Sequence, residues 1–538
     1  MFDVFKGIKR VSHQVKILSK ELSLSSSFPK PKSIRVGLIN WLYKSAKEQG
    51  ICWLDLLQQF HSMILSQGIS NEYYQLWLQY QPSRRELLEK NLNANGSIVS
   101  LAKAASLHPS ALEKLSSLFN SDPNIQVIYT DHDYLDDSNQ RLNPLFKPDW
   151  NLDLFLSTNY LGNAVFLRKE WAEKKFEDLA SIDYLDLLKV LPNLLAESIF
   201  HLPEVLIHFP VSELAKPVGL AIDQTKLKSI DVNIESFEKG SIENSQHLIF
   251  NLPSPTPLVS LIIPTRDHLE LLQPCIRSIL KKTSYKFYEL IIVNNQSVDV
   301  ETLNWLEQIQ QQDQRVKVLD YPYPFNYSAI NNFAVKQAQG SIIGLVNNDI
   351  EVINSGWLDE MVRQASREQI GCVGAKLYYA DGRIQHAGVI LGCGGGSGHA
   401  HRYYPRDSSG YMGRLKLVQN FTAVTGACLL VRKSLYEQVG GLNEKDLPIA
   451  WNDIDLCLKV RQLGYRNLWT PYAELYHHES VSRGRDKTKE KRQRYLAEKD
   501  YMYRTWKELM FQDPCYNPNL TMIGEGFSLG LPRNIFDR

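Results

Sequence analysis

The sequence predicts an α/β protein whose largest domain is built on a mostly parallel sheet. After a proline-rich boundary, NLPSPTP at residues 251–257, apolar segments with the pattern of buried strands alternate with segments of helical pattern. Strands are expected at residues 259–265, 288–297 and 315–321, and the apolar segment SIIGLVNNDIEV (341–352) follows them. Apolar strands that alternate with helices of about 10–15 residues are typical of parallel sheets.

Composition favours a folded intracellular protein. The chain has 538 residues, of which 43% are hydrophobic, so several domains with large cores are expected. A net charge of +1 gives no overall basic field, which argues against a nucleic-acid partner. The seven cysteines are dispersed without a CxxC pair, and no apolar run is long enough to cross a bilayer. We therefore expect a cytoplasmic protein.

The first 35 residues predict a basic amphipathic helix followed by a Ser/Pro/Lys linker. They contain eight Lys or Arg and two acidic residues, and apolar residues recur at helical spacing. Such a helix can bind an anionic surface, which would make the protein peripheral at the inner face of the cytoplasmic membrane. The alternative is an ordinary helix packed on the next domain. Helical periodicity continues to about residue 90, and a further strand is expected at 125–135.

Polar side chains follow the predicted strands at the end where parallel sheets bind ligands. They are Thr265 and Asp267 after the first strand, Asn295 after the second, and Asn347, Asn348 and Asp349 within the segment 341–352. A carboxylate and a carboxamide on a tight turn can hold a hard divalent cation, which in turn binds diphosphate oxygens. The same turn could instead only cap the next helix.

Two later segments carry side chains suited to catalysis. Asp453 lies with Asp455 at the start of a predicted helix in AWNDIDLCLKVRQLGY. A carboxylate there could act as a general base, although acidic residues are also common in a first helical turn. His477 and His478 end a predicted short strand. An imidazole at that point could ligate the same metal as Asp349, or be an ordinary core or surface histidine.

A basic run and a glycine-rich stretch complete the candidate segments. The run at residues 482–494 includes Arg483 and could neutralise a leaving group beside a metal–diphosphate site, or form a solvated helix face. The glycine-rich stretch GCGGGSGHAHR (392–402) lacks the strand–turn–helix context of a dinucleotide-binding fold. We interpret it as a flexible loop on the substrate side.

The order of these segments resembles glycosyltransferase family 2. The resemblance runs from VSLIIPT through IIVNNQS, NND, TGACLLVRK and WNDIDLCLKVRQLGY to YHHES, and is strongest in DGRIQHAGVILG, GHAHR, NFTAVTGACLLVR and PYAELYHHESVSRG. These segments look like the large bacterial enzymes of O-antigen and other surface polysaccharide synthesis. The resemblance implies a GT-A fold and an inverting hexosyl- or deoxyhexosyltransferase. Its donor would be a nucleotide-diphosphate sugar, its cofactor Mn²⁺ or Mg²⁺, and its acceptor a glycan or lipid-linked hydroxyl.

The resemblance also implies residue roles. Asp453 matches the catalytic base, Asp349 the metal ligand of the family's DxD motif, and His477 the histidine that completes the metal site, with His478 as the alternative. Thr265 and Asp267 would lie beside base and ribose, Asn295 where many members have an aspartate that contacts uridine, and Gly426 and Ala427 beside the donor sugar. Asn347 and Asn348 belong to the DxD motif with Asp349, and the remaining donor-binding positions would be Asn332 and Arg483. His386 and the glycine-rich stretch would face sugar or acceptor.

The N-terminal half resembles part of a second domain of the same family. VIYTDHDYLDD, FKPDWNLDLFLSTNYLGNAVFLRKE and IFHLPEVLIHFP carry this likeness, and matching HPSALE puts Ala102-Lys103-Ala104-Ala105 where the acidic cluster belongs. Three methyls and a cation cannot bind Mn²⁺, so we expect a truncated, silent copy. The alternative is an unrelated helical domain. The expected regions are 1–35 (helix and linker), 36–95 (helical), 96–215 (degenerate partial GT-A-like), 216–254 (linker), 255–485 (catalytic GT-A) and 486–538 (helical extension).

Two other functions compete with sugar transfer. A non-catalytic glycosyltransferase-like scaffold of a polysaccharide assembly complex is suggested by Asn295 and Asn347, which replace acidic residues of the family pattern. The retention of Asp349, Asp453 and His477 favours an enzyme instead. Nucleotidyl transfer would need a glycine-rich basic loop after the first strand, but PTRDHLELL has no glycine. UDP, GDP and dTDP sugars all remain candidate donors.

Overall fold

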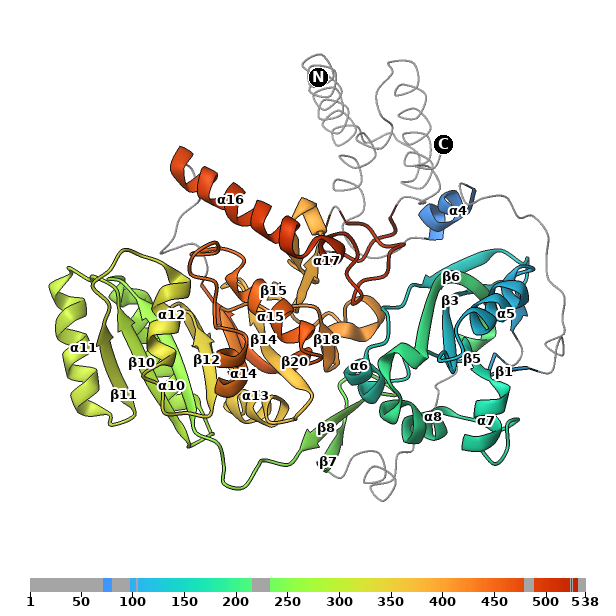
Figure 1. The fold of residues 1–538 in the computed structure, drawn as a ribbon, viewed down its shortest axis with the longest axis horizontal. Coiled ribbons are helices and arrows are strands. Elements are labelled where there is room, and N and C mark those ends of the chain that lie inside the picture. Colours follow the sequence, from blue (N-terminus) through green and yellow to red (C-terminus); the bar gives the residue numbers. More distant parts are fainter. Residues whose placement is uncertain are drawn as a thin grey trace, which may run out of the picture. The chain divides into compact units, whose positions relative to one another are not determined.

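The computed structural model describes residues 71–79, 97–102, 105–214, 233–478, 488–522, 524 and 526–530 (Figure 1). These residues belong to one compact unit, Ile69–Arg538. The amphipathic helix predicted for residues 1–35 lies outside the described residues, and the helical region predicted for 36–95 is described only as α4 (Asn71–Gln79). Within the described part of the chain, the helices are too short or too polar to span a membrane.

The larger sheet is parallel on one side and mixed on the other. Its strand order is β11 (Val316–Asp320), β10 (Tyr288–Asn294), β9 (Val259–Thr265), β12 (Ile342–Val346), β19 (Cys428–Arg432), β14 (Ile370–Tyr378), β20 (Arg466–His477) and β13 (Ile350–Val352). The first four strands are parallel. β19 is antiparallel to both its neighbours, β20 is parallel to β14, and β13 is antiparallel to β20. The α/β fold class predicted from the sequence is confirmed.

Helices cover both faces of this sheet because successive strand side chains point in opposite directions. Leu261 and Ile263 of β9 pack into one core cluster, whereas Ile262 between them packs into another. The covering helices are α10 (Leu269–Lys282), α11 (Val300–Gln312) and α13 (Trp357–Ala365) on one side, and α12 (Tyr327–Val335) and α15 (Asn452–Gln462) on the other. Every residue of β9 except Pro264 is buried, as expected for a strand enclosed on both faces.

The strand register brings the predicted site segments to one edge of the sheet. Thr265 at the end of β9 pairs with Asn294 at the end of β10, and β12 lies on the other side of β9. The strand predicted to be short before the two histidines is the 12-residue β20. It pairs His477 with Ile350, so the imidazole lies beside the residue that follows Asp349.

The glycine-rich stretch forms the connection of a small hairpin. β16 (Val389–Leu391) pairs with β17 (Ser397–His399), and a single 3-10 turn, Cys393–Gly395, joins them. The neighbouring β15 (Ile384–His386) pairs with β14 at the edge of the large sheet. The stretch expected as a flexible loop is therefore tied to two strands, one of which ends at His399.

A second sheet in the N-terminal half repeats the arrangement of the mixed part of the first. Its strands are β1 (Ile98–Ser100), β5 (Val165–Arg168), β3 (Val127–Leu135), β6 (Ile199–Pro210) and β2 (Ser106–Leu107), with β4 (Arg141–Leu145) on β3. The pairings run antiparallel, antiparallel, parallel and antiparallel. The same sequence of pairings joins β12, β19, β14, β20 and β13, with β15 on β14. Helix α5 (Ala111–Ser121) follows β2 as α13 follows β13.

The register of the two sheets also corresponds. Ser106 pairs with His208, just as Ile350 pairs with His477. Ala105 and His208 therefore take the places of Asp349 and His477 in the second sheet. Among the described residues, this sheet ends at β1 and has no counterparts of β9, β10 and β11.

The predicted linker at residues 216–254 contains a hairpin, so the prediction is wrong for that part. β7 (Ile234–Lys239) pairs with β8 (Gln246–Phe250). The Gln246 amide donates to the Leu156 carbonyl in α6 (Leu152–Ser157) at 2.6 Å, and His247 Nε2 lies 3.0 Å from Glu360 Oε2 in α13. The hairpin thus contacts both halves of the protein.

The C-terminal region begins with the predicted helices and continues as an irregular tail. The helices are α16 (Lys489–Thr505) and α17 (Lys507–Phe511). In the tail, the Thr422 hydroxyl of the larger domain donates to Asp513 at 2.5 Å. The Asn517 amide donates to the Asp131 carboxylate at 2.9 Å and to the Lys147 carbonyl at 2.7 Å, both in the N-terminal half. The tail therefore joins the two halves.

Candidate active site

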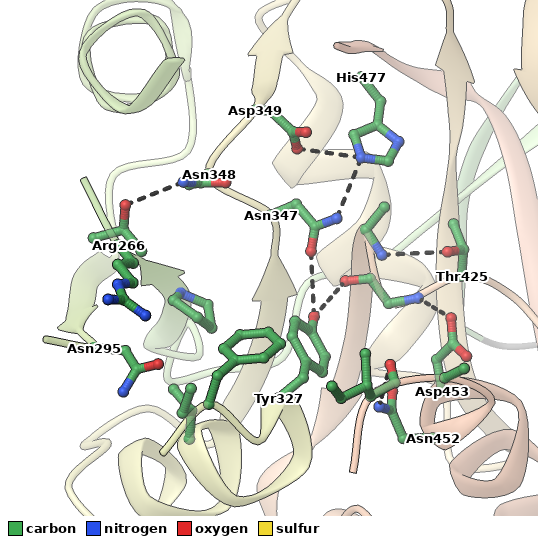
Figure 2. A pocket seen from close by; sticks show the side chains of 18 of the residues that line it. Arg266, Asn295, Tyr327, Asn347, Asn348, Asp349, Thr425, Asn452, Asp453 and His477 are labelled. Carbon is green, nitrogen blue, oxygen red and sulfur yellow. Dashed lines mark hydrogen bonds and ion pairs between the residues drawn. The ribbon is translucent and has the colours of Figure 1, made fainter. Parts of the chain in front are cut away.

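A cavity of about 680 Å³ lies at the carboxyl edge of the parallel strands, beside the start of α15 (Figure 2). Loops after β9, β10 and β12 form one side of it, and the segments before β19 and α15 form the other. The structure brings most of the predicted site residues to this cavity: Thr265, Asp267, Asn295, Asn347, Asn348, Asp349, Gly426, Ala427, Asp453 and His477.

Asp349 and His477 face each other in the cavity wall (Figure 2). Asp349 Oδ1 lies 3.2 Å from His477 Nε2, yet this buried oxygen has no hydrogen-bond partner. His477 Nδ1 lies 2.7 Å from Gln385 Oε1, and the Asn347 amide donates to Nε2 at 3.2 Å. Both contacts require the proton on Nδ1 and leave a lone pair on Nε2.

These residues fit a divalent cation. A buried carboxylate oxygen without a partner and an imidazole lone pair are a ligand combination that Mn²⁺ accepts. Burial acts to raise the pKa of Asp349, but the neighbouring His477 imidazole outweighs this effect and holds that pKa below its usual value. Asp349 is therefore ionised, as a metal ligand must be. His478 instead points toward Glu351, with Nε2 3.4 Å from Oε2, and does not line the cavity.

Asp453 lies across the cavity, near the start of α15. Its Oδ2 accepts from the Gly426 N–H at 2.8 Å, and its Oδ1 from the Ile454 N–H at 2.9 Å. Burial raises the pKa of Asp453 above the usual carboxylate value, although these N–H groups act in the opposite direction. A Cβ atom on Gly426 would lie 3.2 Å from Asp453 Cβ, so glycine permits the close approach. The result is an oriented carboxylate with raised proton affinity.

The loops after β9, β10 and β12 are linked on the opposite side of the cavity. The Asn348 amide donates to the Thr265 hydroxyl at 3.1 Å. Asp267 Oδ1 accepts from the Val298 and Asp299 N–H groups at 2.8 and 2.9 Å, and so joins the first loop to the second. Asp267 therefore has a structural role in this loop as well as a place in the cavity wall.

The local contacts of Asn295 require an amide and not a carboxylate at this position. Its amide nitrogen donates to the carbonyls of Tyr321 and Tyr323 at 3.1 and 2.8 Å. A carboxylate in this position would face two carbonyl oxygens and lose both bonds. Asn295 Oδ1 is buried without a partner and is left as an acceptor.

The structure does not bring every predicted residue to the cavity. Asn332 is absent from its wall, because its side chain bonds the Leu442 backbone at 2.9 and 3.0 Å and the Tyr436 hydroxyl at 2.6 Å. The structure therefore places Asn332 outside this cavity, where it anchors α12. His386 is fully buried behind His399. Arg483 lies outside the described residues.

Several cavity residues were not assigned a role from the sequence. Gln385 orients His477, and the Tyr327 hydroxyl donates to the Gly426 carbonyl at 3.2 Å. Trp451 has a left-handed backbone (φ +67°) directly before α15, and its buried Nε1 has no partner. Lys491 lines the cavity from the first turn of α16. Lys491 had a signal in the sequence as a member of the basic run at 482–494, and Gln385 and Trp451 lie in segments that carry the family resemblance.

Comparisons with known proteins agree with this architecture. Residues 260–440 match the model described as Glycosyl transferase family 2. Uncharacterized protein y4gI of Sinorhizobium fredii (strain NBRC 101917 / NGR234) is 46% identical over 448 residues, which make up 79% of this chain and 48% of that protein. O-antigen biosynthesis protein RfbC of Myxococcus xanthus is 34% identical over 433 residues, 77% of this chain and 33% of that protein. The chain thus spans half or less of the length of these relatives.

One solved structure that the chain matches is the mannosyltransferase PcManGT from Pyrobaculum calidifontis in complex with GDP-Man and Mn²⁺. It is 16% identical, with a TM-score of 0.36 over 48% of this chain and 67% of that one. The assignment of the present chain rests on the family match and on the strand order that surrounds the cavity. The α/β domain that contains residues 260–440 has a GT-A-type fold and belongs to glycosyltransferase family 2.

Proposed function

We propose that the chain is an inverting, metal-dependent glycosyltransferase that moves a sugar from a nucleotide-diphosphate sugar to a hydroxyl of a glycan or lipid-linked acceptor. The observation that carries this proposal is the meeting of the Asp349–His477 pair and the Asp453 carboxylate in one cavity. The name of the Myxococcus xanthus relative, an O-antigen biosynthesis protein, supports a role in cell-surface polysaccharide synthesis.

Asp453 is the general base of the proposed reaction. It accepts the proton of the acceptor hydroxyl while that oxygen attacks the anomeric carbon from the face opposite the diphosphate. The new bond joins the acceptor oxygen to this carbon, and the bond from the carbon to the diphosphate oxygen breaks. One displacement inverts the anomeric centre and releases the nucleoside diphosphate. The hydrogen bonds from Gly426 and Ile454 keep the carboxylate oriented for this transfer.

The opposite side of the cavity is suited to the leaving group. Asp349 and His477 would hold a divalent cation, which when bound offsets negative charge on the diphosphate. Lys491 adds a cationic side chain to the same cavity. Asn295 Oδ1 is an acceptor for an N–H group of the nucleobase, a role that supports nucleotide binding without distinguishing among uracil, thymine and guanine.

We further propose that residues 96–215 are a degenerate partial copy of the transferase domain. The shared strand pairings support this interpretation. Ala105 takes the place of the metal ligand Asp349, so the copy would bind no cation there. It keeps a histidine, His208, whose Nδ1 lies 2.5 Å from Asp133 Oδ1 in a buried pair. The copy would contribute packing or acceptor positioning, not catalysis.

Calorimetric titration with UDP, GDP and dTDP, each with and without Mn²⁺, tests the proposal. We expect one of the nucleotides to bind in a Mn²⁺-dependent way, at one site per chain, because the copy has Ala105 in the place that Asp349 takes in the larger domain. Two equivalent nucleotide-binding sites per chain would contradict the proposal that the partial copy at residues 96–215 binds no cation. No binding of any nucleotide would favour the alternative of a non-catalytic scaffold.

A further inference from the structure

One histidine of the segment DGRIQHAGVILG contacts one histidine of the segment GHAHR, and the second of these borders the cavity. His386 at the end of β15 is fully buried, and His399 at the end of β17 lines the cavity. Their Nδ1 atoms lie 2.7 Å apart, and the rings cross at 81°. The assigned roles of metal ligand and general base use neither histidine.

The backbone fixes which ring nitrogens carry protons. The Gly388 N–H donates to His386 Nε2 at 3.3 Å, so Nε2 is an acceptor and a neutral His386 carries its proton on Nδ1. His386 Nδ1–H then donates to His399 Nδ1. His399 must therefore carry its own proton on Nε2. Among the described residues, this Nε2 has no hydrogen-bond partner.

Both imidazoles are neutral at physiological pH. Burial, together with the charge of Arg402, lowers the pKa of His399 to about 3. Burial also lowers the pKa of His386 well below its usual value. A neutral imidazole is an N–H donor without a formal charge, which suits a hydroxyl or carbonyl oxygen better than a phosphate.

The position of this donor within the cavity indicates which part of a ligand it meets. Gln385, next to His386, orients the metal-site residue His477. A Cβ atom on Gly396, in the same hairpin as His399, would lie 3.2 Å from the Trp451 ring, and Trp451 lies two residues before Asp453. The hairpin therefore borders the region between metal site and base. The anomeric carbon must lie in that region, whereas Asn295 and the nucleobase loops lie on the other side.

We propose that His399 binds the donor sugar by donating a hydrogen bond from Nε2–H to one of its hydroxyl or acyl oxygens, and that His386 acts as a positioning residue that fixes this tautomer. The inference deepens the proposed function and rests on it. It makes the His386–His399 pair a determinant of sugar specificity, separate from nucleotide and metal binding. A sugar that lacks an oxygen at the contacted position would leave the N–H without a partner.

Two nearly isosteric variants test this assignment. His399→Gln keeps an N–H donor, and His399→Leu removes it. We would titrate wild type and both variants with UDP, GDP and dTDP, each alone and as UDP-glucose, GDP-mannose and dTDP-rhamnose, in the presence of Mn²⁺. All three proteins should bind the free nucleotide within about twofold. His399→Leu should bind the corresponding nucleotide sugar about tenfold more weakly than wild type, and His399→Gln should recover most of that loss.

The outcomes separate the inference from the proposed function. Nucleotide binding by wild type with equal nucleotide-sugar affinity in all three proteins would overturn only the role of His399. No nucleotide binding by wild type would overturn the proposed function and this inference with it. NMR of the full chain labelled with ¹⁵N-histidine gives a check that needs no variant. The spectrum should show His399 neutral and protonated on Nε2. A proton on Nδ1 instead would overturn the assigned tautomer and the positioning role of His386.

Discussion

At Asp453, burial and hydrogen bonding act in opposite directions on one carboxylate. Burial raises its pKa, whereas the N–H groups of Gly426 and Ile454 lower it, and burial has the larger effect. Burial makes the carboxylate a stronger base, and the two hydrogen bonds hold it in one orientation. General bases gain efficiency when their pKa moves toward the working pH, so this balance suits proton abstraction from a sugar hydroxyl.

Replacement of this base should separate chemistry from binding. Asp453→Asn keeps the size of the side chain but cannot take a proton, so we expect turnover to fall about 10²- to 10⁴-fold with nucleotide affinity nearly unchanged. In wild type, the rate should decline on the acid side through a pKa above the ordinary carboxylate value of about 3.9, because the base works only when deprotonated. Initial rates across pH, together with calorimetry, measure both effects. Near-normal turnover in the variant would remove Asp453 from its role.

A substitution in the Asp349–His477 pair should instead change how nucleotide affinity depends on Mn²⁺. Asp349→Ala removes the carboxylate that faces His477, so Mn²⁺ should no longer increase nucleotide affinity, while metal-free binding stays within about twofold. Asp137→Ala, at an exposed position of the N-terminal half, is the matched control and should behave as wild type. Calorimetry with and without Mn²⁺ measures the difference. An undiminished Mn²⁺ effect would exclude Asp349 as a ligand.

Single residues were predictable where the partner is near in sequence or where the family pattern is strong. Asp349, His477 and Asp453 follow strands or begin a helix, and these positions can be read locally. Gln385 could not be found in this way, because it acts on His477 across 92 residues of chain. The place of Asn332 outside the cavity was equally hidden, since its partners, Tyr436 and Leu442, lie more than 100 residues away.

Among the elements, α16 stabilises the segment that leads to the base. Glu498 of α16 is almost fully buried, and its Oε1 accepts from the Ile449 N–H at 3.0 Å. Ile449 and Trp451 line the cavity shortly before Asp453. A second contact joins the next residue after α16 to α15, since the Trp506 indole donates to Asp455 Oδ1 at 2.9 Å.

Loss of the Glu498 contact should therefore impair catalysis from a distance. Glu498→Ala leaves the Ile449 N–H without its buried acceptor, and we expect turnover to fall about tenfold and stability to fall by about 1–3 kcal/mol. Glu498→Gln retains an acceptor oxygen and should keep most of both. Initial rates and urea unfolding of the two variants provide the comparison. Equal turnover of Glu498→Ala and wild type would exclude a positioning role for α16.

Elements that depend on local pattern were predicted more accurately than those that depend on pairing. The bounds expected for β9, residues 259–265, agree with the structure, because an apolar strand is encoded locally. The antiparallel insertion of β19 between β12 and β14 was not predicted, since partners far apart in sequence determine it. The hairpin β7–β8 was missed because its strands are short, six and five residues.

At the scale of the whole molecule, one buried carboxylate joins the two halves. Asp153 in α6 lies 2.6 Å from Arg367 Nη1 and 3.4 Å from Arg466 Nε, both in the larger domain. The Asn420 amide donates to the same carboxylate at 2.6 Å. Burial acts to raise the pKa of Asp153, but the two arginines outweigh it and keep that pKa below its usual value. The group is therefore charged at neutral pH.

Removal of this carboxylate should weaken the junction between the halves. Asp153→Ala leaves Arg367 buried without its partner, so we expect a loss of about 3–5 kcal/mol in unfolding free energy. Asp137→Ala should change stability by less than about 0.5 kcal/mol, because its side chain is exposed. Guanidinium unfolding, followed by tryptophan fluorescence, measures both variants. A loss no larger than that of the control would show that other contacts hold the junction.

The tail after α17 has a consequence for how the protein is synthesised. Asn517 binds Asp131, 386 positions away in the chain, and Asp513 binds Thr422. A ribosome that synthesises this chain completes both sheets before the tail emerges. Both sheets can therefore fold before the segment that connects them is available. A nascent chain that stops short of residue 513 would contain every proposed catalytic residue, yet the Asp131 carboxylate and the Thr422 hydroxyl would lack these partners. Such a product would be a natural substrate for chaperones and proteases.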